Sequence, residues 1–352
     1  MNLDSWKFDT NAQNEALINE LKGTLFEYLV AESLSRLAGS ECICKTAPDL
    51  RNRLLHYESW LRDHDLELIK FLPSAALPIA ESIKARIPEQ LLGVEVIGKI
   101  AGGSGQKELH ESDLVLHVVR SDGAKEDFFI GLKFCKTNSY VNTKSGGAQT
   151  FLSRYFSQFP KVSQLQDEFN FEMERAYLMM GQTLYEETGL AAQRYEFVGN
   201  FGDEWSESGM SHLPGQLSPK LNHVVLEYYQ RCILSLYEKI TVLYKSSPQM
   251  FVQSLYPLMG FGARNLIQVI VFVDYKCEVD QKHYGLNSFK IHTEQNVHEE
   301  LREMSLGTSP LEISSFEILM RSWRLQIRMK PMNKFTVPGL KVNCSVKYPK
   351  NH

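Results

Sequence analysis

Two apolar runs separated by an Asp-Gly pair are the feature that most constrains the fold of this chain. Residues 112–118 and 128–136 are rich in Val, Leu, Ile and Phe, and Asp122-Gly123 lies between them. Asp-Gly between apolar runs is typical of a tight hairpin turn. The pattern therefore predicts an antiparallel hairpin, and the apolar run over residues 94–100 predicts a third strand before it.

Polar residues lie at the ends of this hairpin. Side chains alternate along a strand, so Glu111 shares a face with Asp113, and Gly131 with Lys133. If the strands pair across the turn, Asp113 and Lys133 meet at the far end. An aspartate there can hold a divalent cation, and a lysine can activate water or stabilise a transition state. The alternative is an ordinary hairpin without a site. In that case the aspartate only marks a strand boundary, and the lysine extends its charged end into solvent from the end of its strand.

The rest of the chain supplies further elements. Leucines at helical spacing predict a helix over residues 13–38, and residues 46–90 are expected to be helical, punctuated by Pro73, Pro78 and Pro88. Ser145-Gly146-Gly147 predicts a loop that opens a helix, and the run 267–274 predicts a buried central strand. The expected order is helix, three strands, helix, long helical insertion, strand.

This order resembles the PD-(D/E)xK nuclease superfamily, and its restriction-endonuclease-like members most closely. The resemblance rests on the segment Lys22 to Glu27 in the first helix, Asp113, Lys133, and the Ser-Gly-Gly segment at 145–147. It covers residues 13–38, 93–158 and 264–276, and it implies a mixed α/β fold with an αβββαβ core, helical insertions and a β-rich C-terminal region. The implied activity is Mg²⁺-dependent cleavage of double-stranded DNA, with Mn²⁺ as a possible substitute, of the type II restriction or related phage-defence kind.

The resemblance also implies roles for individual residues. Asp113 would be the principal metal ligand, with the backbone carbonyl of Leu132 and the carboxylate of Glu111 as further ligands. Lys133 would orient or activate the attacking water. Lys136 and Lys144, which follow the hairpin, are expected to contact DNA.

One residue departs from the family pattern. The glutamate expected two residues before the lysine is replaced by Gly131, so Glu27, Glu111 or Gln149 would have to complete the site. Asp127 cannot do so, because at about 3.3 Å per residue it lies roughly 20 Å along the strand from Lys133. If no substitute reaches the site, the chain is a nucleic-acid-binding or complex-forming defence protein without catalysis.

Positive charge gathers at the C-terminal end. Residues 318–352 hold eight Lys or Arg and no Asp or Glu, and residues 324–330 alternate Arg, Gln, Arg and Lys with Leu, Ile and Met. The strand would present its polar face to DNA, because Arg and Gln can make paired hydrogen bonds to base edges. A solvated edge strand is the alternative. The expected DNA-binding residues of this region are Arg321, Arg324, Gln326, Arg328 and Lys330.

Composition sets the remaining bounds. A chain of 352 residues with 43% hydrophobic residues and a net charge of −4 is typical of a globular protein and unlike a basic nucleic-acid coat. Six dispersed cysteines and the lack of a signal or membrane-spanning run indicate a cytoplasmic protein. The expected domains are 1–200, 201–263 and 264–352. A palindromic DNA site would favour a homodimer, and a larger defence complex is the alternative.

Overall fold

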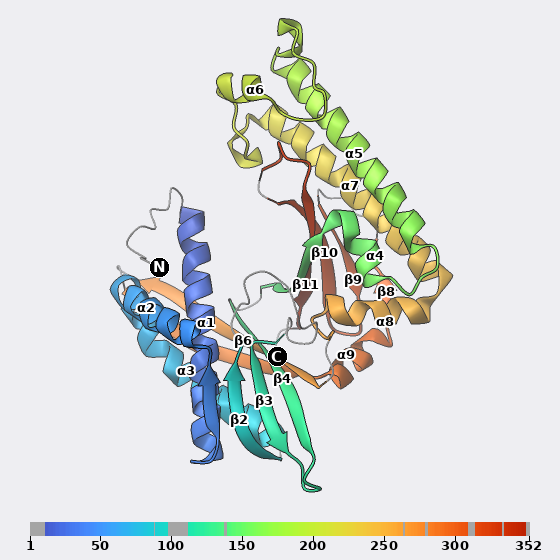
Figure 1. Cartoon of the computed structure of the whole chain (residues 1–352). Helices are drawn as coiled ribbons and strands as arrows, with labels where there is room; N and C mark the ends of the chain where they lie inside the picture. The colour runs from blue at the N-terminus through green and yellow to red at the C-terminus, as the bar shows by residue number, and fades with distance from the viewer. Residues whose placement is uncertain are drawn as a thin grey trace. The chain divides into compact units, whose positions relative to one another are not determined.

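The chain forms two compact units of mixed α/β structure. The computed structural model describes residues 11–87, 89–97, 112–136, 139–262, 265–278, 281–308, 314–332 and 334–349. The first unit combines the chain up to Ser139 with Phe261–Val297, and the second combines Tyr140–Gly260 with the chain from His298 onward. These boundaries differ from the expected 200 and 263, because the segment 140–260 lies in sequence between two strands of one sheet (Figure 1).

A six-stranded mixed sheet is the centre of the first unit. Its strands, in spatial order, are β1 (Ile43–Thr46), β2 (Gln90–Val96), β3 (Leu114–Val119), β4 (Lys125–Lys136), β6 (Leu266–Glu278) and β7 (Gln281–His292). The strands β2, β3 and β4 form an antiparallel meander, β6 runs parallel to β4, and β7 returns antiparallel.

The predicted hairpin is confirmed. Leu114 pairs with Ile130 and Val119 with Lys125, and Gly123 adopts a φ of 81° in the connecting turn. Such a positive φ is the conformation for which glycine is preferred. The predicted strand at 267–274 is also confirmed, as the central part of β6.

Three helices cover one face of this sheet. They are α1 (Asn11–Ala38), α2 (Pro48–His64) and α3 (Leu66–Arg86), and they share a single apolar core with alternate residues of the strands. Pro73 and Pro78 lie inside α3, contrary to the expectation that they interrupt the helix. A proline costs one backbone hydrogen bond, and α3 offsets this loss by burying Leu72 and Ile79 completely.

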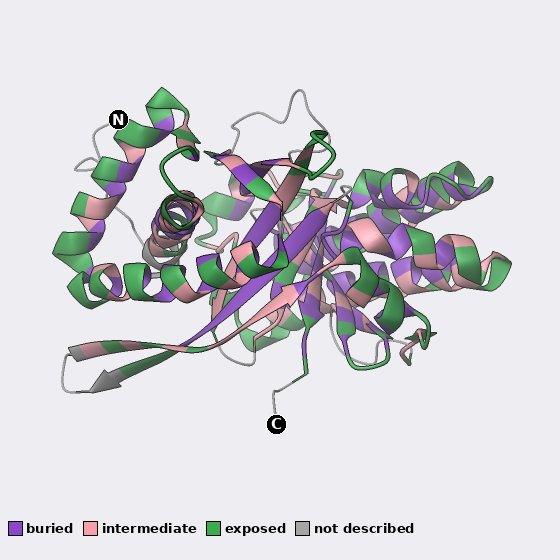
Figure 2. Cartoon of the chain, turned by 90° about the horizontal axis from the view of Figure 1, so that it is seen from below, coloured by how far each residue is buried: buried purple, intermediate pink, exposed green. Residues whose placement is uncertain are grey.

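The second unit contains a five-stranded antiparallel sheet. In spatial order its strands are β5 (Val141–Gly147), β11 (Leu340–Lys347), β10 (Arg324–Pro331), β9 (Ser315–Leu319) and β8 (Ser305–Leu306). Its helices are α4 (Phe151–Tyr155), α5 (Val162–Glu187), α6 (Asp203–Glu207), α7 (Pro219–Ser246) and α8 (Pro248–Leu258), and α9 (Glu294–Leu301) lies at the boundary of the units. The long helices α5 and α7 lie side by side, and Figure 2 shows helices with buried residues on one side and exposed residues on the other.

One expectation for this unit is wrong. Ser145-Gly146-Gly147 is the end of strand β5, not a loop, because its backbone pairs with residues 341–343 of β11. The segment 199–219, which is rich in Gly, Pro and Ser, contains α6, whose Trp205 is fully buried and stacks on Tyr185. In the described part of the chain, no helix combines the length and apolar character that crossing a bilayer requires.

Candidate active site

Asp113 lies directly before the first residue of β3, Leu114. At this edge of the sheet β2 ends, β3 begins and β4 continues further. Its backbone N–H donates to the carbonyl of Ile130 at 2.8 Å, and its Oδ2 accepts a hydrogen bond from the N–H of Leu132 at 2.6 Å. Because Leu114 pairs with Ile130, the antiparallel register places Asp113 opposite Gly131. The carboxylate therefore takes the place of a backbone partner at the end of the ladder.

The candidate catalytic residues project from the face of the sheet opposite to the helices. Leu114, Ile130 and Leu132 belong to the core beneath α1 and α3. Since strand side chains alternate, Asp113, Gly131 and Lys133 point to the other face. The register thus places Asp113 opposite Gly131, with Lys133 two residues further along β4.

A residue that the sequence analysis missed lies beside Gly131. Gln268 on β6 is paired with Gly131 and is only 5% exposed. A Cβ atom at position 131 would lie 2.7 Å from Gln268 Oε1 and 2.8 Å from Nε2. The amide therefore fills the space next to the position where the family pattern has a carboxylate. A signal was present in the sequence, because Gln268 is a polar residue within the apolar run Leu266–Val273.

Two basic residues of β7 lie across the sheet from Gly131 and Lys133. His292 pairs with Gln268, and Lys290 pairs with Ile270, which in turn pairs with Lys133. Burial, together with the positive charges of Lys290 and Arg86, lowers the pKa of His292 from 6.5 to about 4. Burial also lowers the pKa of Lys290. The neutral imidazole of His292 thus lies near Lys290.

The oxygen donors near Asp113 are of the chemical kinds that Mg²⁺ binds. The N–H and C=O groups of one strand residue point to the same side, so the carbonyl of Leu132, like its N–H, is directed toward Asp113. With the Gln268 amide oxygen this gives three kinds of oxygen donor, which suit Mg²⁺, an ion that keeps several waters and needs one or two carboxylates. Among the described residues no group of three or more His, Cys, Asp or Glu could hold a metal ion, and Glu111 lies outside those residues.

The other expected site residues lie on elements outside the first sheet. Glu27 lies on α1, the helix on the covered side of the sheet, next to Phe26, whose ring lies 5.0 Å from that of Phe134. Gln149 is exposed in a short 3₁₀ turn of the second unit, between β5 and α4. The sheet register brings Gln268, and not Gln149, next to Gly131.

The predicted two-faced strand is present as β10. Its polar side also meets Glu317 of β9, which lies opposite Gln326 and forms an ion pair with Arg324 at 3.4 Å. Leu325, Ile327 and Met329 are buried, so the alternate residues of β10 project to the other side. The residues on that side are Arg324, Gln326, Arg328 and Lys330, and their partners on β11 are Lys347, Ser345, Asn343 and Lys341. Burial and the charges of Arg328 and Lys341 lower the pKa of Lys330.

The remaining expected DNA-binding residues are scattered. Arg321 lies in the β9–β10 turn, where it pairs with Glu303 at 3.8 Å. Lys144 pairs with Cys344, a residue of the buried face, next to a bulge in the ladder. Lys136 is exposed at the end of β4 in the first unit.

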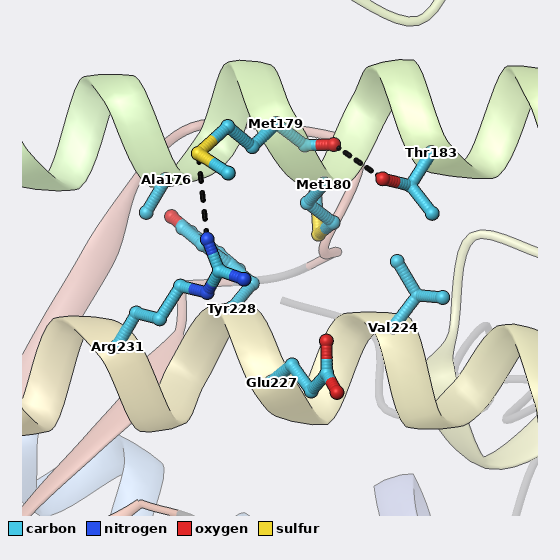
Figure 3. Close-up of a pocket in the computed structure, with 8 residues that line it drawn as sticks. All are labelled: Ala176, Met179, Met180, Thr183, Val224, Glu227, Tyr228 and Arg231. Carbon is cyan, nitrogen blue, oxygen red and sulfur yellow. Dashed lines mark hydrogen bonds between the residues drawn. The ribbon is translucent and has the colours of Figure 1, made fainter.

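A small pocket between α5 and α7 is separate from all of these residues (Figure 3). Its volume is about 40 Å³, and Arg231 Nη1 donates across it to the sulfur of Met179 at 3.4 Å. Such a space accommodates about one water molecule.

The close approach of Gly131 and Gln268 predicts a coupled response to mutation. Gly131→Ala should lower the free energy of unfolding by about 1–3 kcal/mol, because the buried amide must move. In a Gln268→Ala background the same change should cost much less, with a coupling energy above about 0.5 kcal/mol in urea unfolding. Gly285→Ala is the control, since a Cβ there meets nothing within 4 Å. Equal costs in both backgrounds would contradict the packing described.

The neutral state of His292 predicts a dependence of stability on pH. Below pH 6.5 the unfolded chain binds a proton at this side chain, whereas the folded protein binds it only near pH 4, so stability falls as pH is lowered. The expected loss between pH 7.5 and pH 5 is about 2 kcal/mol. Wild type should show this loss relative to His292→Gln in urea unfolding at both pH values. His283→Gln, at an exposed position of the same strand, should keep the wild-type dependence.

A scan against protein-family models matches no family, and a search of curated proteins finds no similar sequence. The geometry around Asp113 and the chemistry of its neighbours therefore carry the functional argument.

Proposed function

We propose that this chain is a metal-dependent endonuclease that hydrolyses phosphodiester bonds of double-stranded DNA. The observation that carries the proposal is the position of Asp113 and Lys133 on one face of adjacent strands, with the Asp113 carboxylate held by the N–H of Leu132. The element order supports it in part, because α1 precedes the three strands β2, β3 and β4 and the strand β6 follows them, as in the αβββαβ order that the resemblance implies. The helices between β4 and β6 belong to the second unit.

Each residue has a role that follows from its chemistry. Asp113, the Leu132 carbonyl and the Gln268 amide oxygen would hold Mg²⁺, which supplies a Lewis acid and lowers the pKa of bound water. The Lys133 ammonium would offset negative charge on the phosphoryl oxygens as it develops. Because Gln268 is neutral, the described ligands carry one negative charge fewer than a pair of carboxylates. We therefore expect weaker metal binding than a two-carboxylate site gives.

The basic face of the second sheet would bind the DNA backbone. Lys330 lies directly opposite Lys341, with Arg328 next along the same strand. Like charges directly opposite one another destabilise a sheet, so a bound phosphate would relieve a cost that this arrangement carries. A homodimer would match the two-fold symmetry of a palindromic DNA site.

A nucleic-acid-binding protein without catalysis is the second candidate. The observation that favours it is Gly131. With glycine at this position, β4 supplies no carboxylate beside Asp113. Such a protein would keep DNA binding that weakens with salt and would show no cleavage with Mg²⁺ or Mn²⁺.

Plasmid cleavage in Mg²⁺ or Mn²⁺ tests the first candidate. Asp113→Ala and Lys133→Ala should each lower the cleavage rate by about 10²-fold or more, because the first removes the carboxylate that would hold the metal and the second removes an ammonium that would offset developing negative charge. Asp127→Ala and Lys125→Ala, at exposed positions of the same hairpin, are the matched controls and should cleave like wild type. Wild type without cleavage would favour the second candidate, and unchanged cleavage by Asp113→Ala and Lys133→Ala would place the site elsewhere.

DNA binding at several salt concentrations tests the basic face. Arg328→Ala and Lys330→Ala should each weaken binding and reduce the slope of log K against log salt by about one, since each removes a phosphate contact. Lys161→Ala, an exposed lysine beside α5, should leave the slope unchanged. A slope that responds equally to all three variants would show that general charge, not this face, binds DNA.

A further inference from the structure

A second cavity lies in the first unit, on the face of the sheet that α1 covers. Its volume is about 180 Å³, and it lies at the carboxyl ends of the parallel strands β4 and β6. Phe134 and Val273 form part of its wall, and both point to the helix-covered side with the core residues of their strands. The cavity is therefore separated by the sheet from the face that carries Asp113 and Lys133.

Positive charge dominates the lining. Lys22 from α1, Lys136 from β4 and Lys282 from β7 all contribute, and among the described lining residues Asp65 supplies the carboxylate. The Lys22 ammonium lies 5.4 Å from the centre of the Phe134 ring. The lining thus has two more positive charges than negative ones, which favours an anionic ligand.

Asp65 organises the cavity and is not available to hold a cation. Its side chain is 2% exposed and accepts hydrogen bonds from Lys282 Nζ at 2.9 Å and from the Tyr284 hydroxyl at 2.7 Å. It also accepts from the N–H of Leu68 at 3.2 Å, which caps α3. A buried carboxylate with three donors fixes the positions of the lysine and the tyrosine that line the cavity.

Aromatic surface completes the site. The rings of Tyr275 and Tyr284 lie 5.3 Å apart at 41°, and Tyr284 in turn stacks on Phe71. Tyr275 is 43% exposed, so a ring of this platform is open to a ligand. Aromatic side chains stack on the bases of single-stranded nucleic acids at about 1–3 kcal/mol per base.

We propose that this cavity binds a 5′-phosphorylated nucleotide, with the phosphate between Lys22 and Lys136 and the base on Tyr275. A nucleotide is a common ligand that joins an anion to a flat ring, and these two features are what the lining offers. The volume admits the phosphate and sugar, and the base lies on the exposed tyrosine. The ligand is either a free mononucleotide or the 5′ end of a nucleic-acid strand, and both present the same chemistry.

Fluorescence anisotropy with methylanthraniloyl-labelled AMP tests the proposal on the full chain carrying Asp113→Ala. This background prevents cleavage of added DNA, and Asp113 does not line the cavity, so the result is independent of the proposed nuclease activity. We expect binding that Lys136→Ala and Tyr275→Ala each weaken about tenfold, while Lys276→Ala, next to Tyr275 but outside the lining, changes it less than about twofold. Unchanged thermal unfolding of the variants shows that they fold.

Competition identifies the ligand chemistry. Unlabelled AMP should displace the probe at concentrations at least about tenfold lower than inorganic phosphate or adenosine alone. A short 5′-phosphorylated oligonucleotide that outcompetes its 5′-hydroxyl counterpart assigns the cavity to strand ends, and competition by AMP alone assigns it to free nucleotides. Absence of probe binding at about 1 mM, displacement by phosphate as effective as by AMP, or equal weakening by Lys276→Ala would overturn the proposal.

Discussion

The hydrogen bond between the Leu132 N–H and the Asp113 carboxylate determines how the first sheet ends. The strand β4 runs on past the start of β3, so the buried N–H of Leu132 has lost its backbone acceptor on that side. Leaving such a group unsatisfied costs about 1–3 kcal/mol. The carboxylate of Asp113 satisfies it at 2.6 Å and is oriented in return. Asp113 therefore ends the sheet and also presents an oxygen donor. The same hydrogen-bonded arrangement suits a structural aspartate at a strand boundary and an aspartate that holds a metal ion.

Gly131 and Gln268 form a second constraint, because the buried amide occupies the space that a side chain at position 131 would need. Glycine within a strand weakens it and marks a place where another group approaches closely. A buried amide within an apolar strand costs free energy unless it has partners and space. Here the missing side chain of Gly131 leaves the space that the Gln268 amide occupies. The absence of a side chain on β4 and the presence of an amide on β6 are thus one packing arrangement, in which a neutral oxygen donor lies beside position 131.

Sequence patterns that act over a few residues predict some features of the fold, but they do not predict pairing between distant segments. The hairpin and the two-faced strand β10 follow from alternation and from the Asp122-Gly123 turn, which act within a few residues. Gln268 was out of reach, because its pairing with Gly131 joins strands that lie on either side of the inserted segment 140–260. The sequence predicts a loop at Ser145-Gly146-Gly147 because Gly has low strand propensity, and the pairing of this end of β5 with β11 overrides that preference.

The two sites proposed for the first unit share the end of β4. The charges of Lys22, which lines the cavity, and of Lys133, on the opposite face, both lower the pKa of the half-buried Cys135 thiol against the effect of burial. Both ammonium groups therefore act on one point of the sheet. A phosphate bound near Lys22 would add negative potential there, and a divalent cation near Asp113 would add positive potential, so each would favour the binding of the other. Such a coupling is reciprocal by thermodynamic necessity, whichever ligand binds first.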